Sequence, residues 1–196
     1  MKRFKGLFLI LFGLVVFSSC TEEDAVYPKP LSAMRLSFPE KDFSKMLKFC
    51  DYSFNIPHYT EVDTSKGKCN MNLNYLGFNA TLYLTYIPID TSLKYHIENS
   101  RKLVYDHSIK ADAIEEKLII NSNNKVFGMA YRLVGNSASN YQFYVTDSSN
   151  HFLRGALYFN CKPNYDSLKP TIDFLAVDLD TLVNSLTWLE TNNLAE

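Results

Sequence analysis

Cys20 is the residue whose chemistry is easiest to predict, because of what precedes it. The chain starts with a positive segment (MKRFK), continues with an apolar run over residues 6–17, and places two serines directly before Cys20. The run is shorter than the roughly 20 residues that a membrane-spanning helix needs, and the whole arrangement is typical of a secretory signal. Lipoprotein signal peptidases cleave before a cysteine whose thiol has been acylated. We therefore predict a lipoprotein signal peptide over residues 1–19 and lipidation of Cys20, rather than an ordinary signal peptide or an uncleaved anchor.

Three further cysteines could form disulfides in the oxidising cell envelope. Cys50 and Cys69 flank a segment rich in turn-forming and polar residues, 56–68. A bridge between them would close a loop, which is worth roughly 3 kcal/mol on the loop-entropy account. We predict a disulfide between Cys50 and Cys69, and we expect Cys161 to be a buried thiol, since free cysteines are among the most buried residues.

The histidines offer little support for catalysis or metal binding. His96 and His107 are eleven residues apart on one expected helix, which separates them by roughly 16 Å, and no Cys/His spacing matches a zinc site. The chain also lacks the HExxH, GxSxG, P-loop and GxGxxG motifs. His107 falls on the apolar stripe of its helix, where a core histidine is the favoured interpretation over a catalytic one. We predict no enzyme, no cofactor and no metal.

Arg154 is the charged residue that calls for an explanation, because it interrupts the apolar segment HFLRGALYF of residues 151–159. By alternation it shares a strand face with apolar neighbours, and a buried arginine must be paired. A carboxylate such as Asp112 or Asp147 should then lie close by. A core ion pair is the favoured interpretation, and a surface for a binding partner is the alternative.

The elements expected around these residues form one α+β domain. Alternating apolar residues predict strands, and stripes at three- and four-residue steps predict two principal helices. Strands in succession with inserted helices indicate a mainly antiparallel sheet. The predicted strands are 34–38, 54–56, 71–75, 79–87, 117–120, 126–134, 141–146 and 151–159; the predicted helices are a short one at 41–49, a long one from a cap at Thr91 or Ser92 to Ile114, and a last one with Pro170 in its first turn that reaches Leu189.

The composition and the division of the chain into segments also bear on its class. The net charge of −1 excludes a typical nucleic-acid-binding protein, and the 14% aromatic content favours a sheet-rich fold. Residues 20–32, which are polar and contain proline, are expected to be the lipidated cysteine and a tether. Residues 33–196 are expected to be the single folded domain.

Several segments together resemble the gliding-motility lipoprotein GldD family of the Bacteroidetes. The most specific is QFYVTDSSNHFLRGALYF at residues 142–159; YPKP at 27–30, FPEK at 38–41, the cysteine pair, HSIKADAI at 107–114 and PNYDSL at 163–168 add to it. The resemblance implies an envelope lipoprotein that takes part in gliding and in type IX protein secretion, without enzymatic activity. One departure is the asparagine after Cys69, because the family often has tryptophan and phenylalanine there. The order of elements also resembles the PsbP/Mog1-like α/β/α sandwich.

Two functions follow as hypotheses. The first is a non-enzymatic accessory or stabilising component of the type IX secretion and gliding machinery, anchored to a membrane by its lipid and bound to other proteins of that machinery. The alternative is a surface lipoprotein that binds a glycan or another small ligand. The acidic residues 22–24 resemble a signal for export to the cell surface, whereas the family suggests the periplasm, and both placements remain open.

Two short segments match the Asp-Ser/Thr-apolar pattern of O-glycosylation in the Bacteroidetes. The acceptor residues would be Ser167 and Thr181. Ser167 is the better candidate, because it is expected in a loop, whereas Thr181 is expected on a helix.

Overall fold

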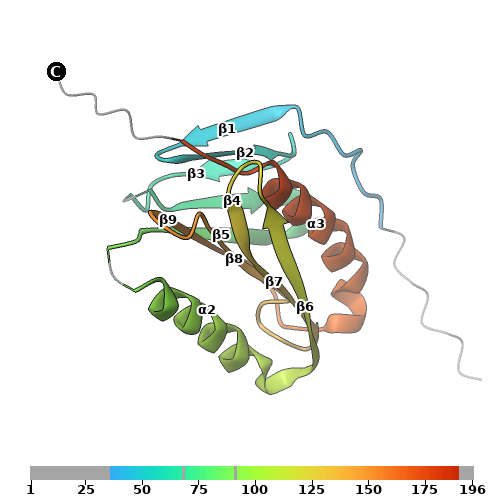
Figure 1. Ribbon diagram of the computed structural model, residues 1–196. Helices are drawn as coiled ribbons and strands as arrows, with labels where there is room; N and C mark the ends of the chain where they lie inside the picture. The colour runs from blue at the N-terminus through green and yellow to red at the C-terminus, as the bar shows by residue number, and fades with distance from the viewer. Residues whose placement is uncertain (1–35, 68, 91, 190–196) are drawn as a thin grey trace, which may run out of the picture. The chain divides into compact units, whose positions relative to one another are not determined.

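The computed structural model describes residues 36–67, 69–90 and 92–189 (Figure 1). The chain divides into two units, residues 1–37 and 38–196, and the secondary structure given below belongs to the second unit. The signal peptide, Cys20 and the tether lie outside the described residues. Residues 36–38 have no regular structure, so the described part of the strand expected at 34–38 is not a strand.

A seven-stranded antiparallel sheet forms the centre of the fold, which confirms the predicted α+β class with a mainly antiparallel sheet. Three of its strands, 71–75, 141–146 and 151–159, have the predicted bounds. In spatial order the strands are β3 (Glu61–Asp63), β4 (Met71–Tyr75), β5 (Ala80–Pro88), β9 (His151–Phe159), β8 (Tyr141–Thr146), β7 (Val126–Gly135) and β6 (Ala111–Asn121).

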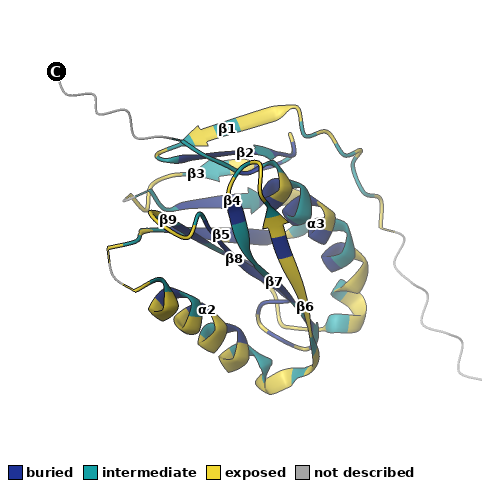
Figure 2. Cartoon of the chain, in the orientation of Figure 1, coloured by how far each residue is buried: buried dark blue, intermediate teal, exposed yellow. Residues whose placement is uncertain are grey.

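One helix packs on each face of this sheet (Figure 1). Helix α3 (Tyr165–Ser185) buries Leu175, Leu179 and Leu182 in the main core, together with every second residue of the central strands. Helix α2 (Leu93–His107) packs on the opposite face through Val104. Figure 2 shows the buried residues on the inward sides of the strands and helices. The main core takes Phe143, Val145, Leu153 and Leu157 from β8 and β9, and the second cluster takes Tyr131, Leu133, Tyr144 and Phe152.

A second, three-stranded sheet corrects two of the predicted helices. It consists of β1 (Lys45–Phe49), β2 (Tyr52–Ile56) and β10 (Thr187–Trp188). The short helix expected at 41–49 is wrong, because residues 45–49 pair with β2 along their whole length. The last helix ends at Ser185 rather than near Leu189, because the residues that follow pair with β2 from its other side.

The long helix also ends earlier than the sequence indicates. It stops at His107, and a 3-10 turn (Ser108–Lys110) leads into β6. The residues from Ala111 to Ile114, expected on the helix, instead pair with β7 across a bulge between Ala111 and Ala113. The backbone hydrogen bonds that this long hairpin supplies outweigh the helical apolar stripe.

Helix α3 begins at Tyr165, so Pro170 lies inside the helix and not in its first turn as predicted. Asn164 is the N-cap, and its side-chain Oδ1 accepts a hydrogen bond from the backbone N–H of Ser167. This is the usual way to satisfy an orphan donor at a helix start. Within the residues that the structure describes, no helix combines the length and the apolar character needed to cross a bilayer.

An ion pair in the interior ties the segment before β1 to α3. Asp178 is fully buried, and its carboxylate accepts hydrogen bonds from the Lys41 ammonium and from the Tyr59 hydroxyl. Lys41 Nζ also donates to the carbonyl oxygen of Phe174 at 2.7 Å and lies 3.4 Å from the centre of the Phe174 ring. Burial raises the pKa of Asp178 above its ordinary value, although the hydrogen bonds from Lys41 and Tyr59 lower it.

Candidate functional site

A hollow of about 460 Å³ opens on the sheet face that carries α2. The apolar cluster under α2 includes Phe152 of β9 and Ile87 of β5, but residues further along these two strands lie beyond it. Tyr83, for example, is 41% exposed. We call this hollow the Arg154 pocket; its walls are Tyr83 and Thr85 of β5, Arg154, Ala156 and Tyr158 of β9, and residues 159–160.

Arg154 lies half-buried in this pocket without a carboxylate partner. Its Nη2 atom donates a hydrogen bond of 3.0 Å to Oε1 of Gln142 on the neighbouring strand β8. Among the described residues no acidic side chain forms an ion pair with it, so the expected pairing with Asp112 or Asp147 is wrong. Burial lowers the pKa of Arg154, as expected for a cation that gives up water without gaining a counter-ion.

The two aspartates lie elsewhere, and local backbone groups hold Asp147. Asp147 sits in the β8–β9 turn, where its Oδ1 accepts the N–H groups of Ser149, Asn150 and His151 at 2.8–2.9 Å. Burial alone would raise the pKa of the Asp147 carboxyl, but these three donors lower it. Asp112 is exposed at the β6 bulge, close to Gly135 of the paired strand.

Gln142 is the second polar residue of the site, and its side-chain amide nitrogen has no hydrogen-bond partner among the described residues. The residue is 1% exposed. Its Oε1 accepts from Arg154, but among the described residues its buried Nε2 donor has no acceptor. A buried polar group without a partner costs roughly 1–3 kcal/mol. Such a group in a native fold calls for an explanation.

Tyr158 joins the pocket to the end of α2 through His107. The Tyr158 hydroxyl donates to His107 Nε2 at 3.0 Å, and His107 Nδ1 donates to the carbonyl oxygen of Leu103 at 2.6 Å. These two bonds place the imidazole proton on Nδ1, so both ring nitrogens are matched. His107 therefore positions Tyr158 and reaches Arg154 only through it. Burial raises the pKa of Tyr158, whereas the charge of Arg154 lowers it.

The Arg154 pocket offers hydrogen-bond donors to a ligand. Its walls supply a guanidinium and hydroxyl groups, and no carboxylate or thiol is among them. Across residues 36–67, 69–90 and 92–189, no three His, Cys, Asp or Glu side chains are grouped closely enough to hold a metal ion. This arrangement suits recognition of a ligand with acceptor groups.

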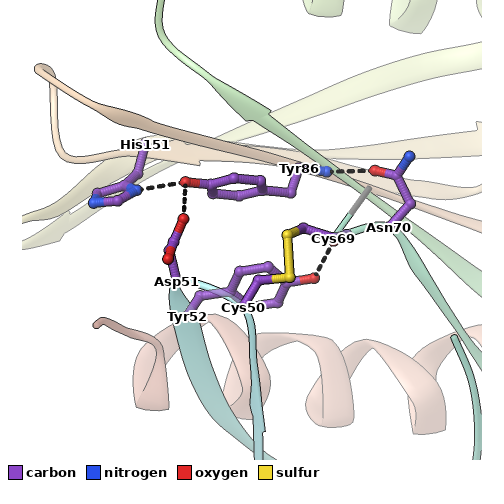
Figure 3. Close-up of a disulfide and its surroundings, with 7 residues drawn as sticks. All are labelled: Cys50, Asp51, Tyr52, Cys69, Asn70, Tyr86 and His151. Atoms are coloured by element: carbon purple, nitrogen blue, oxygen red, sulfur yellow. Dashed lines mark hydrogen bonds between the residues drawn. A yellow bond between two sulfur atoms is a disulfide. The ribbon is translucent and has the colours of Figure 1, made fainter. Parts of the chain in front are cut away.

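A disulfide joins Cys50, in the turn between β1 and β2, to Cys69, which precedes β4 (Figure 3). The Tyr52 hydroxyl donates to the carbonyl oxygen of Cys69 at 2.8 Å. The residue after Cys69 is Asn70, and its Oδ1 accepts the backbone N–H of Tyr86 at 2.9 Å. At this position Asn70 therefore makes a polar contact with the backbone of β5.

A short chain of hydrogen bonds lies beside the disulfide (Figure 3). The Tyr86 hydroxyl donates to Asp51 Oδ2 at 3.0 Å and pairs with His151 Nδ1 at 2.7 Å. Since the hydroxyl has one proton, His151 Nδ1 is the donor in the second bond. The Trp188 ring stacks on His151, with 5.1 Å between the ring centres. These contacts join the small sheet to β5 and β9.

Three other predicted positions are not among the walls of the Arg154 pocket. Cys161 is exposed in the loop after β9, so the expected burial is wrong; the polar residues beside it, Asn160 and Lys162, belong to that loop. Ser167 is exposed in the first turn of α3 rather than in a loop. Thr181 lies on α3, and its hydroxyl donates to the carbonyl oxygen of Val177.

Three residues of the site, Tyr83, Thr85 and Gln142, were not predicted from the sequence. A signal for Gln142 is present, because it is a polar residue in the otherwise apolar strand YQFYVT. The β8–β9 hairpin places Gln142 opposite Ala156 and Tyr144 opposite Arg154. Since residues two apart on paired strands lie on one face and are within reach of long side chains, this register brings Gln142 to Arg154. No comparable signal marks Tyr83 or Thr85.

The family model described as gliding motility lipoprotein GldD matches residues 23–188. No curated protein matches the chain.

Proposed function

The chain belongs to the GldD family of gliding motility lipoproteins, and from this premise we propose that it is a non-enzymatic accessory or stabilising subunit of the type IX secretion and gliding machinery. It would act from the cell envelope, held to a membrane by a lipid on Cys20. Its direct contacts would be with other proteins of that machinery.

The observation that carries a binding role is the unpaired Arg154. A half-buried cation without a counter-ion lowers the stability of the fold. The presence of Arg154 at this position therefore calls for a functional reason. It lies in the segment 142–159, on which the resemblance to the family chiefly rests. The walls of its pocket supply hydrogen-bond donors and no carboxylate or thiol, which supports recognition of a ligand.

A strain that lacks the gene, complemented with tagged variants, tests this function. We expect the native chain to restore secretion of type IX cargo and to copurify with machinery proteins after envelope crosslinking. Arg154→Met should fold but fail in both measurements. Its unfolding free energy should fall by about 1–2 kcal/mol, the cost of leaving Gln142 Oε1 unpaired, rather than by the 3–5 kcal/mol of a broken buried ion pair.

The control is Arg132→Met on β7, because Arg132 is the partner of Asp173 in an ion pair that is partly exposed. Exposed pairs contribute little, so this variant should keep secretion and complex recovery. Normal secretion in the deletion strain, or recovery of the chain without machinery proteins, would refute the proposed function. A folded and fully active Arg154→Met variant would instead remove Arg154 from it.

The lipid anchor makes a separate prediction. Cys20→Ala should accumulate as an unprocessed precursor or leave the membrane fraction, because stable anchoring needs more than one acyl chain and the acylated cysteine supplies them. Fractionation with mass spectrometry of the mature N-terminus measures this. An unmodified mature N-terminus at another residue would show that Cys20 is not the anchor.

A further inference from the structure

Several polar groups in and beside the Arg154 pocket lack a hydrogen-bond partner among the described residues. They are N–H donors or hydroxyls. Arginine has five N–H donors, and within the described part of the chain Arg154 uses one of them, toward Gln142. The Gln142 Nε2 donor next to it is buried and unpaired. The hydroxyls of Tyr83 and Thr85 form no hydrogen bond with other described side chains or backbone. The pocket is therefore short of acceptors and has one positive charge.

We infer that the Arg154 pocket binds a ligand through a single carboxylate. The guanidinium matches a carboxylate with two parallel N–H···O bonds, which gives both strength and orientation. Phosphate would bring nearly two negative charges, whereas the pocket walls contain one cation, Arg154. This inference deepens the proposed function, because it names what the Arg154 surface would recognise on a partner.

The walls of the pocket also indicate what accompanies the carboxylate. The Tyr83 and Tyr158 rings meet edge to face, with 5.6 Å between their centres and an angle of 79° between their planes. Aromatic rings in this arrangement offer faces and edges to a flat or apolar group. The hollow of about 460 Å³ lies within the range of small-ligand sites. The ligand is thus a carboxylate next to an aromatic or apolar body, either the C-terminus of a peptide or a small organic acid.

The backbone of β9 shapes this surface through Gly155, beside Arg154. A Cβ atom on Gly155 would lie 2.2 Å from the Phe143 ring, so the glycine lets that ring pack on the opposite face of the sheet. Close packing behind the pocket fixes the strand that carries Arg154. The guanidinium is held in turn by Gln142 Oε1, and this preorganisation reduces the ordering cost of binding.

The test is a titration of the purified full-length chain in an uncharged detergent. The probes are benzoate, its neutral analogue benzamide, inorganic phosphate, and the peptide Gly-Gly-Phe with a free or an amidated C-terminus. The readout is the Nε–H resonance of Arg154, assigned by its loss in Arg154→Lys. We expect a saturable shift with benzoate at a Kd on the order of millimolar, and none with benzamide.

The peptide pair distinguishes the two sources of the carboxylate. Tighter binding of the free peptide than of benzoate, lost on amidation, would identify a peptide C-terminus; benzoate binding alone would identify a small acid. Calorimetry on Arg154→Lys should show at least tenfold weaker benzoate binding. Lysine keeps the positive charge but lacks the planar guanidinium that donates two parallel hydrogen bonds to a carboxylate. The matched Arg132→Lys variant should bind as the native chain does.

Three results would overturn the inference. They are no saturable binding of any carboxylate, equal binding of benzoate and benzamide, and phosphate binding tighter than that of both carboxylates. Since the titration does not involve secretion, its failure leaves the proposed accessory role standing. Conversely, carboxylate binding in a chain that is dispensable for secretion would refute the proposed function and not the ligand class.

Discussion

Lys41→Met is expected to lower the free energy of unfolding at pH 7 by about 3 kcal/mol. Removing one partner of a buried ion pair costs roughly 3–5 kcal/mol, because the other charge is left uncompensated in the interior. We expect the lower end, since the Lys41 side chain is 24% exposed, whereas Asp178 is fully buried. Methionine can keep the contact with the Phe174 ring, so the loss reports charge rather than packing.

The effect should depend on pH in a defined direction. The folded-state pKa of Asp178 is already raised above 3.8, and loss of Lys41 raises it further. A carboxyl with a raised folded-state pKa destabilises the fold when it is ionised, and this penalty disappears as the pH falls through that pKa toward 3.8. The stability difference between Lys41→Met and the native chain should therefore shrink from pH 7 to pH 4.

Urea denaturation followed by the fluorescence of Trp188, the single tryptophan, measures both effects. In the double variant Lys41→Met/Asp178→Asn the amide still accepts from Tyr59, and much of the lost stability should return. Lys102→Met breaks the exposed pair with Asp106 on α2 and should cost less than about 0.5 kcal/mol. A loss in Lys41→Met that stays constant from pH 7 to pH 4 would mean that Lys41 acts through packing alone.

The central hairpin was predictable because its sequence contains the whole reason for its structure. Strands β8 and β9 are mainly apolar segments on either side of a turn of Asp, Ser and Asn, so composition and turn chemistry agree. Nothing comparable marks residues 45–49, whose composition suits a helix and which become strand β1 only because β2 pairs with them. The same holds for Ala111–Ile114, where the long partner strand β7 decides the outcome. Pairing between segments is not visible in either segment alone.

The candidate site was predictable to a similar extent. Arg154 was predictable as a site residue, because it is a charged residue in an apolar strand. The assumption that its partner must be a carboxylate was wrong, because the register of β8 against β9 supplies the neutral Gln142 instead. Tyr83 reaches the pocket through the pairing of β5 with β9, two strands more than 60 residues apart in the chain. Only the structure reveals such a neighbour.

Removal of the disulfide in Cys50→Ser/Cys69→Ser should lower the free energy of unfolding by about 3 kcal/mol. The bond spans a sequence separation of 19 residues, and on the chain-entropy account a loop of this size restricts the unfolded ensemble by that amount. The bond also connects the β1–β2 turn to the segment that enters the seven-stranded sheet (Figure 3). Its loss should thus loosen the small sheet first.

Hydrogen exchange and denaturation together separate these two consequences. Exchange should accelerate most at β1 and β2, because beyond the disulfide these two strands are held by α3, by β10 and by contacts such as Tyr86 to Asp51. The native chain under reducing conditions should reach the stability of the double serine variant. Cys161→Ser is the matched control, because the exposed thiol can be exchanged within about 0.5 kcal/mol. A double variant as stable as the native chain, with unchanged exchange at β2, would show that packing against α3 alone holds the small sheet in place.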